Sequence, residues 1–279
     1  MEYLGSRLFC PPPIGKQTPC EISYYNEWDG FRRVLTCTPE GRLALTPTIA
    51  IFVDGSCKYN GLPWARAGMG VYFGPNSWRN HNEELLYGRL TSQRAEIQAA
   101  ILALDYVKSC LDAQELNTDT VVLFSDSKIV VSAMTCHIAR WRLNGWMTTN
   151  CSNVRNQEDF VQLDNLVEEL KYTYGVLVKF WHIMREWNKG ADREARMATS
   201  GRGSINQDPP KHTLSSLRDA KTKESNTALH KVNAVAEAVQ RDGELRRDHF
   251  TYNIGVISRL TGCRKIGGFT PTKQSTGYT

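Results

Sequence analysis

The chain has 279 residues, of which 41% are hydrophobic and 23% charged, and it contains seven Trp and eleven Tyr. This composition argues against global disorder, and the length suffices for one well-buried domain with residues left over for flanking segments. The formal net charge of +5 is compatible with a polyanionic partner. Many proteins that touch no nucleic acid share such a charge, so it distinguishes little on its own.

Cysteine usage and the N-terminus bear on the compartment. The eight cysteines are scattered, with no CxxC pair and no zinc-finger spacing, which favours reduced thiols inside a cell. The N-terminus lacks the basic start and apolar run of a secretory signal, and no apolar stretch approaches the ~18 residues of a membrane span. We therefore expect a soluble intracellular protein with no membrane partner, and the sequence does not distinguish nucleus, cytoplasm and mitochondrion.

Residues 1–45 are rich in Pro, Gly and Thr and show no sustained hydrophobic period, which predicts an irregular N-terminal arm. The pattern changes at residues 46–54, where TPTIAIFVD is β-branched and aromatic and predicts a buried strand. The following Gly55-Ser56 is typical of a turn. Asp54 is therefore expected at the end of this strand.

Two more strands are expected, at residues 68–74 and 85–90. The second leads directly into TSQRAEIQAAILAL, where Thr91 or Ser92 is expected as the N-cap of a helix. Apolar residues then recur at helical spacing and predict a helix of about five turns. Glu96 lies in its first turns.

The next part of the chain alternates between strands and helices. Residues 121–124 predict a strand that is followed by Asp126 and then by a helix. Residues 158–174 predict a helix, residues 176–181 a strand, and the last helix of this part carries Asp192. Three strands and a helix, followed by this alternation, predict an α/β layer fold with a mixed sheet covered by helices.

The composition turns polar beyond residue 201, which predicts a linker. A helix is expected around residues 227–241, and residues 267–279 are expected to be disordered. The predicted organisation is an irregular arm at 1–45, one domain at 46–201, and a linker, one helix and a disordered tail at 202–279.

Four acidic residues stand at positions suited to a site. Asp54 and Asp126 follow strands, Glu96 lies in the first turns of a helix, and Asp192 opens the last helix. If these elements are neighbours in space, the repulsion between the carboxylates favours a bound cation. Oxygen ligands without His or Cys favour Mg²⁺ or Mn²⁺ over zinc. Two such ions roughly 4 Å apart suit phosphodiester hydrolysis, although an Asp after a strand, taken alone, is a turn or cap residue in about two of three cases.

Several short motifs, in order along residues 46–200, resemble those of the cellular type 1 ribonucleases H, and in particular eukaryotic, fungal-like members. The motifs are AIFVDGSCKYNG, ARAGMGVYFGP, TSQRAEIQAAILAL, VVLFSDSKIVV, WRLNGWMT, RNQEDF and NKGADREA. The Gln-Arg-Ala-Glu sequence in the third is diagnostic of that family. The resemblance implies a ribonuclease H-like fold with a mixed five-stranded sheet flanked by helices.

The resemblance also implies an activity. Members of the family are hydrolases that cut the RNA strand of RNA/DNA hybrids endonucleolytically, by two-metal-ion catalysis, and leave 5′-phosphates. Their catalytic, metal-binding acids correspond to Asp54, Glu96, Asp126 and Asp192, and all four are present. We therefore expect two Mg²⁺ or Mn²⁺ ions as cofactors, an RNA/DNA hybrid as partner, and a monomer.

Two residues correspond to family residues that contact the minor groove and the RNA 2′-hydroxyls, Asn60 and Gln93. Hydroxyl contacts are how such a protein distinguishes RNA from DNA. Without the resemblance, Asn60 before Gly61 is a turn residue by about three to one, and Gln93 is a solvated residue of a first helical turn.

The DNA strand is expected to meet a phosphate pocket and an aromatic pair. The resemblance assigns the pocket to Arg89, Thr91 and Asn156, and the aromatic pair, which would lie against the DNA sugars, to Trp141 and Trp146. The alternatives are a surface charge for Arg89, a position before a helix cap for Asn156, and a core position for Trp141.

The chain departs from many family members between the last strand and the last acid. The interval from His182 to Asp192 is short and lacks the second, mobile His of those members, so it resembles the short-loop branch, which includes active enzymes. Loss of one proton shuttle typically costs about a hundredfold in rate. Two alternatives therefore stay open: a catalytically weak or inactive hybrid-binding module of the same fold, and a transposase or integrase core acting on DNA. A second departure, Glu194 in place of Leu, predicts less regular packing of the last helix.

Overall fold

The computed structural model describes residues 6–12, 17–37 and 43–200. The expected linker, the helix at 227–241 and the tail lie outside these residues. In chain order the elements are α1 (Pro19–Ile22), β1 (Ser23–Tyr25), β2 (Arg32–Cys37), β3 (Leu43–Lys58), β4 (Arg66–Tyr72), β5 (His81–Leu85), α2 (Ser92–Asp112), β6 (Thr120–Ser125), α3 (Lys128–Ser132), α4 (Ile138–Leu143), α5 (Gln157–Tyr174), β7 (Leu177–His182) and α6 (Lys189–Ala198), with a π-helical turn at Ala133–His137 and a 3₁₀ turn at Arg185–Trp187.

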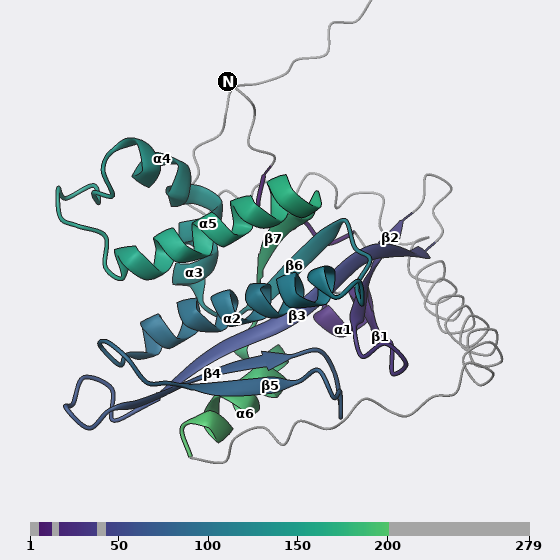
Figure 1. The fold of residues 1–279 in the computed structure, drawn as a ribbon, viewed down its shortest axis with the longest axis horizontal. Coiled ribbons are helices and arrows are strands. Elements are labelled where there is room, and N and C mark those ends of the chain that lie inside the picture. The colour runs from purple at the N-terminus through teal and green to yellow at the C-terminus, as the bar shows by residue number, and fades with distance from the viewer. Residues whose placement is uncertain (1–5, 13–16, 38–42, 201–279) are drawn as a thin grey trace, which may run out of the picture. The chain divides into compact units, whose positions relative to one another are not determined.

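Five of these strands form the expected mixed sheet. β3, β4 and β5 pair antiparallel in sequence order, while β6 pairs parallel with β3 and β7 pairs parallel with β6 (Figure 1). The α/β fold and the mixed five-stranded sheet with flanking helices are therefore confirmed. β3, β6 and β7 are parallel, so the residues that follow β6 and β7 lie together at the carboxyl end of these strands.

Residues 23–37 correct the prediction of an irregular arm, because within the described part of the chain they raise the sheet from five strands to seven. β2 pairs with the first half of β3, where Arg32 faces Ala50, and the Arg32 guanidinium donates to the carbonyl oxygen of Phe73 just past β4 (3.1 Å). Phe31 is fully buried against Phe73. The Thr18-x-x-Glu21 capping box at the start of α1 is a sequence signal of order that the prediction did not use.

Two strand boundaries differ from those predicted. β3 continues past Gly55 to Lys58 and pairs there with β4, so Gly55-Ser56 is not a turn. The third strand lies at 81–85 and not at 85–90. Its sequence HNEEL is polar because the strand lies at the edge of the sheet, while Leu86 and Tyr87, which suggested a strand, are exposed loop residues.

The sheet is covered on both faces. Ile49, Ile51 and Val53 of β3 belong to the larger apolar cluster with α2 and α5, whereas Ala50 and Phe52 belong to a second cluster with Ala191 of α6. Successive residues of a strand point to opposite faces, so α2 and α5 lie on one face of the sheet and α6 on the other (Figure 1). None of the described helices combines the length and apolar composition that a membrane crossing requires.

The N-terminal segment lies along the outer edge of β7. The backbone amide of Phe180 donates to the carbonyl oxygen of Arg7 (2.7 Å), and that of Phe9 donates to the carbonyl oxygen of Phe180 (2.9 Å). The Arg7 guanidinium is buried and donates to Asp164 of α5 (2.8 Å), which also accepts from Arg142 of α4. Asp164 therefore holds the N-terminal segment and α4 on α5.

Asp164→Asn is expected to destabilise the fold by up to about 3 kcal/mol, because it removes one of the two carboxylates, with Glu168, that compensate the buried Arg7. Urea denaturation measures this loss. The matched control is Arg66→Ala at the exposed Arg66–Glu84 pair, which is expected to cost much less because solvent screens that pair. An equal, small loss in both variants would contradict a structural role for Asp164.

Candidate active site

Asp54 is the most buried of the four acids, with 8% of its surface exposed. It lies within β3 opposite Gly70 of β4, and its Oδ1 accepts a hydrogen bond from the backbone amide of Gly55 (2.8 Å). Burial is the main cause that raises the pKa of Asp54 to about 7, and the charges of Asp126, Asp192 and Glu96 raise it further. The other three acids therefore lie close enough to Asp54 to oppose its ionisation.

Gly55 allows α2 to come this close to Asp54. A Cβ built on Gly55 would lie 2.1 Å from the backbone nitrogen of Glu96 and 2.2 Å from the carbonyl carbon of Ala95. Only glycine permits such an approach between a strand and the start of a helix. The residue that the sequence suggested as a turn therefore brings Glu96 beside Asp54.

Glu96 is held by a residue that follows β6. The Ser127 hydroxyl donates to Glu96 Oε2 (2.5 Å) and also accepts from the Val130 amide, which caps α3. Burial is the largest cause that raises the pKa of Glu96, and Asp126 raises it too, while Ser127 and Arg185 lower it. Ser127 thus connects the acid of α2 to the loop that carries Asp126.

Asp126 directly follows β6, as predicted. Its Oδ1 accepts from the side-chain amide of Asn188 (2.8 Å), and its carbonyl oxygen lies 3.2 Å from Nε2 of His182. His182 ends β7, and burial lowers the pKa of its imidazole, which favours the neutral form. Asp126 is therefore positioned from two neighbouring segments.

Asp192 lies in the first turn of α6, also as predicted. Its carboxylate accepts from Nε of Arg196 (3.0 Å), and Arg185 lies 3.9 Å away. The two arginine side chains are 61% and 77% exposed, so these ion pairs are screened by solvent and weak. They do not amount to a buried ion pair that would remove Asp192 from the site.

The acids present only oxygen donors. As placed, no three His, Cys, Asp or Glu side chains of the described residues are grouped closely enough to hold a metal ion. The mutual effect of the four carboxylates on the pKa of Asp54 nevertheless fits a cation, because a positive charge would relieve both their repulsion and the cost of burying Asp54. This donor set matches hard divalent cations.

The residues expected to contact the hybrid lie at the starts of loops and helices. Asn60 is exposed in the turn after β3, and Gln93 lies half-buried in the first turn of α2. Arg89 is exposed just before α2, and Asn156, with φ of +54°, precedes α5 without capping it through its side chain. Thr91 caps α2 by accepting from the Arg94 amide (3.2 Å).

Arg94 and Asp159 were missed by the sequence interpretation. The Arg94 guanidinium donates to both carboxylate oxygens of Asp159 (3.0 and 3.1 Å), which joins the first turn of α2 to that of α5. Thr91 and Asn156 stand at those two helix starts and are held near one another as a result. The Arg of the Gln-Arg-Ala-Glu motif was the available signal, but its partner lies 65 residues away.

The aromatic pair differs from the expectation. Trp141 is 8% exposed and packs against Phe160, with ring centroids 5.6 Å apart, so it is a core residue. Trp146, at φ of +63°, is half-buried, and its ring packs at a tilt against that of Trp141, with centroids 6.0 Å apart. Of the two, Trp146 keeps the larger exposed surface. Glu194, expected to disturb α6, is buried and accepts from the Asn82 side chain (2.9 Å).

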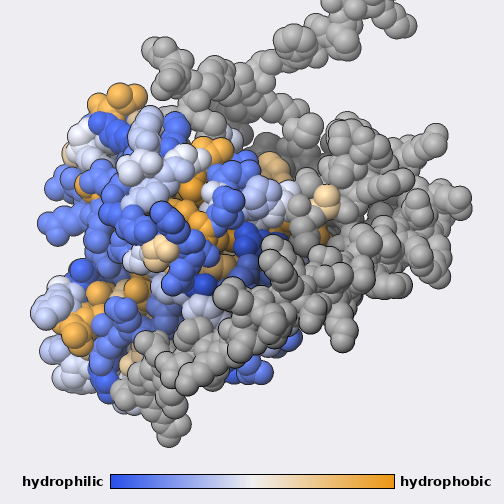
Figure 2. Space-filling model, turned by 45° about the vertical axis from the view of Figure 1, so that its right-hand side comes forward, coloured by the Kyte–Doolittle hydropathy of each residue, from blue (hydrophilic) through white to orange (hydrophobic). Residues whose placement is uncertain are grey.

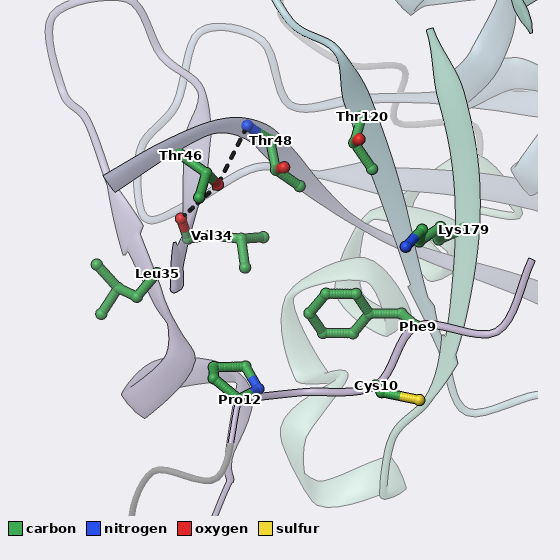
Figure 3. A pocket seen from close by; sticks show the side chains of 9 residues that line it. All are labelled: Phe9, Cys10, Pro12, Val34, Leu35, Thr46, Thr48, Thr120 and Lys179. Atoms are coloured by element: carbon green, nitrogen blue, oxygen red, sulfur yellow. Dashed lines mark hydrogen bonds between the residues drawn. The ribbon is translucent and has the colours of Figure 1, made fainter. Parts of the chain in front are cut away.

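A separate pocket of about 200 Å³ lies between the N-terminal segment and the sheet, lined among others by Phe9, Thr48, Thr120 and Lys179 (Figure 3). Thr120 begins β6, whereas Asp126 follows it, so this pocket lies at the other end of that strand from the acids. None of the four acids lines this pocket. On the face drawn in Figure 2, hydrophobic surface forms small patches among hydrophilic side chains.

The RNase H family model matches residues 46–200. Ribonuclease H1 of Mus musculus and of Homo sapiens are 37% and 36% identical to the chain, and each match covers 53% of this chain and 49% of the relative. Ribonuclease H of Schizosaccharomyces pombe is 30% identical, with 58% and 57% covered. The chain thus spans about half the length of these relatives. A solved structure of LC11-RNase H1 in complex with RNA/DNA hybrid is 22% identical and covers 54% of this chain and 96% of that chain, with a TM-score of 0.39.

Proposed function

The chain belongs to the ribonuclease H family through residues 46–200, and from this we propose that it is an endoribonuclease that hydrolyses the RNA strand of RNA/DNA hybrids. The observation that carries the proposal is the convergence of the four acids: the close approach at Gly55 brings Glu96 beside Asp54, and Ser127 and Asn188 connect Glu96 and the start of α6 to Asp126 and its loop. Four carboxylates close together at the carboxyl end of the parallel strands are suited to holding cations against a phosphate.

We assign the four acids as the ligands of two divalent ions, Mg²⁺ or Mn²⁺. Bound at this site, such ions supply activation of the attacking water and stabilisation of the 3′ leaving oxygen, which gives 5′-phosphate and 3′-hydroxyl ends. Asp54 must lose its proton to act as a ligand, so binding is favoured as the pH rises toward 7 and above. Asn188 and Ser127 hold Asp126 and Glu96 in place from outside the set of ligands.

Recognition of the hybrid is assigned to two groups of residues. Asn60 and Gln93 are proposed to contact RNA 2′-hydroxyls, which distinguishes the RNA strand from DNA. Arg89, Thr91 and Asn156 are proposed to bind a phosphate of the DNA strand, and the Arg94–Asp159 ion pair would keep the two helix starts of this pocket together. Such contacts give a marked salt dependence and little sequence specificity.

A weak or inactive hybrid-binding module is not favoured, because all four acids are present and the other three lie close enough to Asp54 to oppose its ionisation. The loss expected from the short interval before Asp192 is one of rate, since a missing proton shuttle leaves the cation ligands unchanged.

The test is cleavage by the full chain of a labelled RNA/DNA hybrid, of duplex DNA and of single-stranded RNA, with Mg²⁺, with Mn²⁺ or with a chelator. We expect the RNA of the hybrid to be cut only when the metal is present, leaving 5′-phosphates that a phosphatase removes. The Asp54→Asn variant serves as the inactive control. A hybrid that binds but stays whole under every condition would contradict the enzyme, and equal cleavage of duplex DNA would contradict the substrate.

A further inference from the structure

Asn188 is completely buried beside the acids, at the start of α6. Its side-chain amide donates to the carbonyl oxygen of Val53 (3.0 Å) and to Oδ1 of Asp126 (2.8 Å). Its backbone carbonyl oxygen accepts from the backbone amide of Asp192 (3.0 Å). One residue is therefore bonded to the neighbour of Asp54, to Asp126 and to Asp192.

The two acceptors beside Asn188 need two hydrogen-bond donors, and the side-chain nitrogen of Asn188 supplies both. The pairing of β3 with β6 ends at Phe52, so the carbonyl oxygen of Val53 lies just beyond that ladder, and Asn188 supplies its donor. The second amide hydrogen goes to the Asp126 carboxylate. A side-chain amide offers two such hydrogens in a fixed plane, whereas a hydroxyl offers one and a carboxylate offers none.

Packing alone does not explain an amide here. Oδ1 of Asn188 is buried without a hydrogen-bond partner among the described residues, and a buried acceptor left unsatisfied costs free energy. An apolar side chain of the same size would avoid that cost. The reason for an amide at this position is therefore its two donated hydrogen bonds, to Val53 and Asp126.

We propose that Asn188 is a positioning residue that fixes the Asp126 carboxylate relative to Asp54 and Asp192 and thereby sets the affinity of the site for divalent cations. The inference rests on the proposed function for its consequence in catalysis, but cation binding can be measured without any nucleic acid. Residues that orient metal ligands typically change metal affinity or activity by about 10- to 100-fold when removed.

The experiment compares the full chain with Asn188→Leu, which keeps the branched shape of the side chain and removes both donors. Mn²⁺ alone is titrated by calorimetry, and kcat and KM for the hybrid are measured as functions of the Mg²⁺ concentration. We expect the Mn²⁺ dissociation constant and the half-saturating Mg²⁺ concentration to rise roughly tenfold or more, kcat to fall, and KM for the hybrid to stay within about twofold.

Asn82→Leu is the matched control. Asn82 is also buried, its amide donates to Glu194 (2.9 Å), and its Oδ1 likewise has no partner among the described residues. Its replacement is expected to change stability but not Mn²⁺ binding. If Asn188→Leu fails to fold, Asn188→Ser, which retains one donor, is expected to give an intermediate shift.

Unchanged Mn²⁺ binding in Asn188→Leu, or equal shifts in the Asn188 and Asn82 variants, would overturn the positioning role and leave cleavage by the unmodified chain intact. An unmodified chain that binds Mn²⁺ but leaves every hybrid whole would instead overturn the proposed function. The two failures are therefore distinguishable.

Discussion

Asp54→Asn is expected to abolish hybrid cleavage and, at the same time, to stabilise the cation-free protein. The rate should fall on the order of a thousandfold or more, because the variant loses the most buried of the proposed ligands. Stability should rise because burial and three neighbouring carboxylates oppose ionisation of Asp54, whose pKa stands at about 7 against 3.8 for an ordinary Asp. This difference corresponds to up to about 4 kcal/mol above pH 7.

The raised pKa of Asp54 also predicts how the stability of the cation-free protein changes with pH. Between about pH 4 and pH 7 the folded state retains a proton on Asp54 that the unfolded chain releases, so stability falls as the pH rises through this window and levels off above it. Urea midpoints measured with a chelator at pH 5 and pH 8 should therefore differ more for the unmodified chain than for Asp54→Asn. The exposed Asp119 gives the control, Asp119→Asn, which should retain the full difference. An identical pH dependence in Asp54→Asn would contradict the raised pKa.

Gly55→Ala is expected to damage both fold and activity. The added Cβ would overlap the backbone of Ala95 and Glu96, and a helix backbone cannot yield as the end of a flexible side chain can. The start of α2 must then move off β3, which we expect to cost about 3 kcal/mol or more in urea denaturation. Glu96 moves with it, and a displacement of about 1 Å at a catalytic group lowers kcat roughly a hundredfold.

Gly175→Ala is the matched control for that substitution. Gly175 ends α5 at φ of +70° with no atom within 4 Å of the position of a Cβ, so only backbone strain opposes the change. We expect a loss of about 1 kcal/mol and no change in kcat. Equal activity of the two variants would show that α2 does not depend on the close approach at Gly55.

The parts of the fold that sequence reasoning predicted are those with a strong local period. The helices α2 and α5 and the buried strands β3, β6 and β7 have apolar residues at regular spacing, which their burial requires. β1 and β2 were missed because β1 pairs with β2 and β2 with the first half of β3, pairings that no local pattern reveals. The end of β3 was misjudged because a glycine needed for close packing looks the same as a glycine in a turn.

The candidate site divides in the same way. The four acids were predicted because strand ends and helix starts can be read locally and because the motifs carry them. Asn188, Ser127 and the Arg94–Asp159 pair were not, since each acts on a residue 31 to 135 positions away in the chain. Trp141 illustrates the converse, because the structure gives it the core position that the sequence offered as the alternative to a contact with the nucleic acid.

The contact of residues 7–9 with β7 bears on how the chain is made. Arg7 is separated from Asp164 by 157 residues, so a nascent chain exposes this segment long before its partners leave the ribosome. Until then Arg7 stays solvated, and β7, once formed, offers an open row of backbone amides and carbonyls to other molecules. Docking of residues 7–9 pairs the backbone of Phe180 and closes part of that row, so a segment synthesised well before β7 shields this strand from other copies only once β7 has formed.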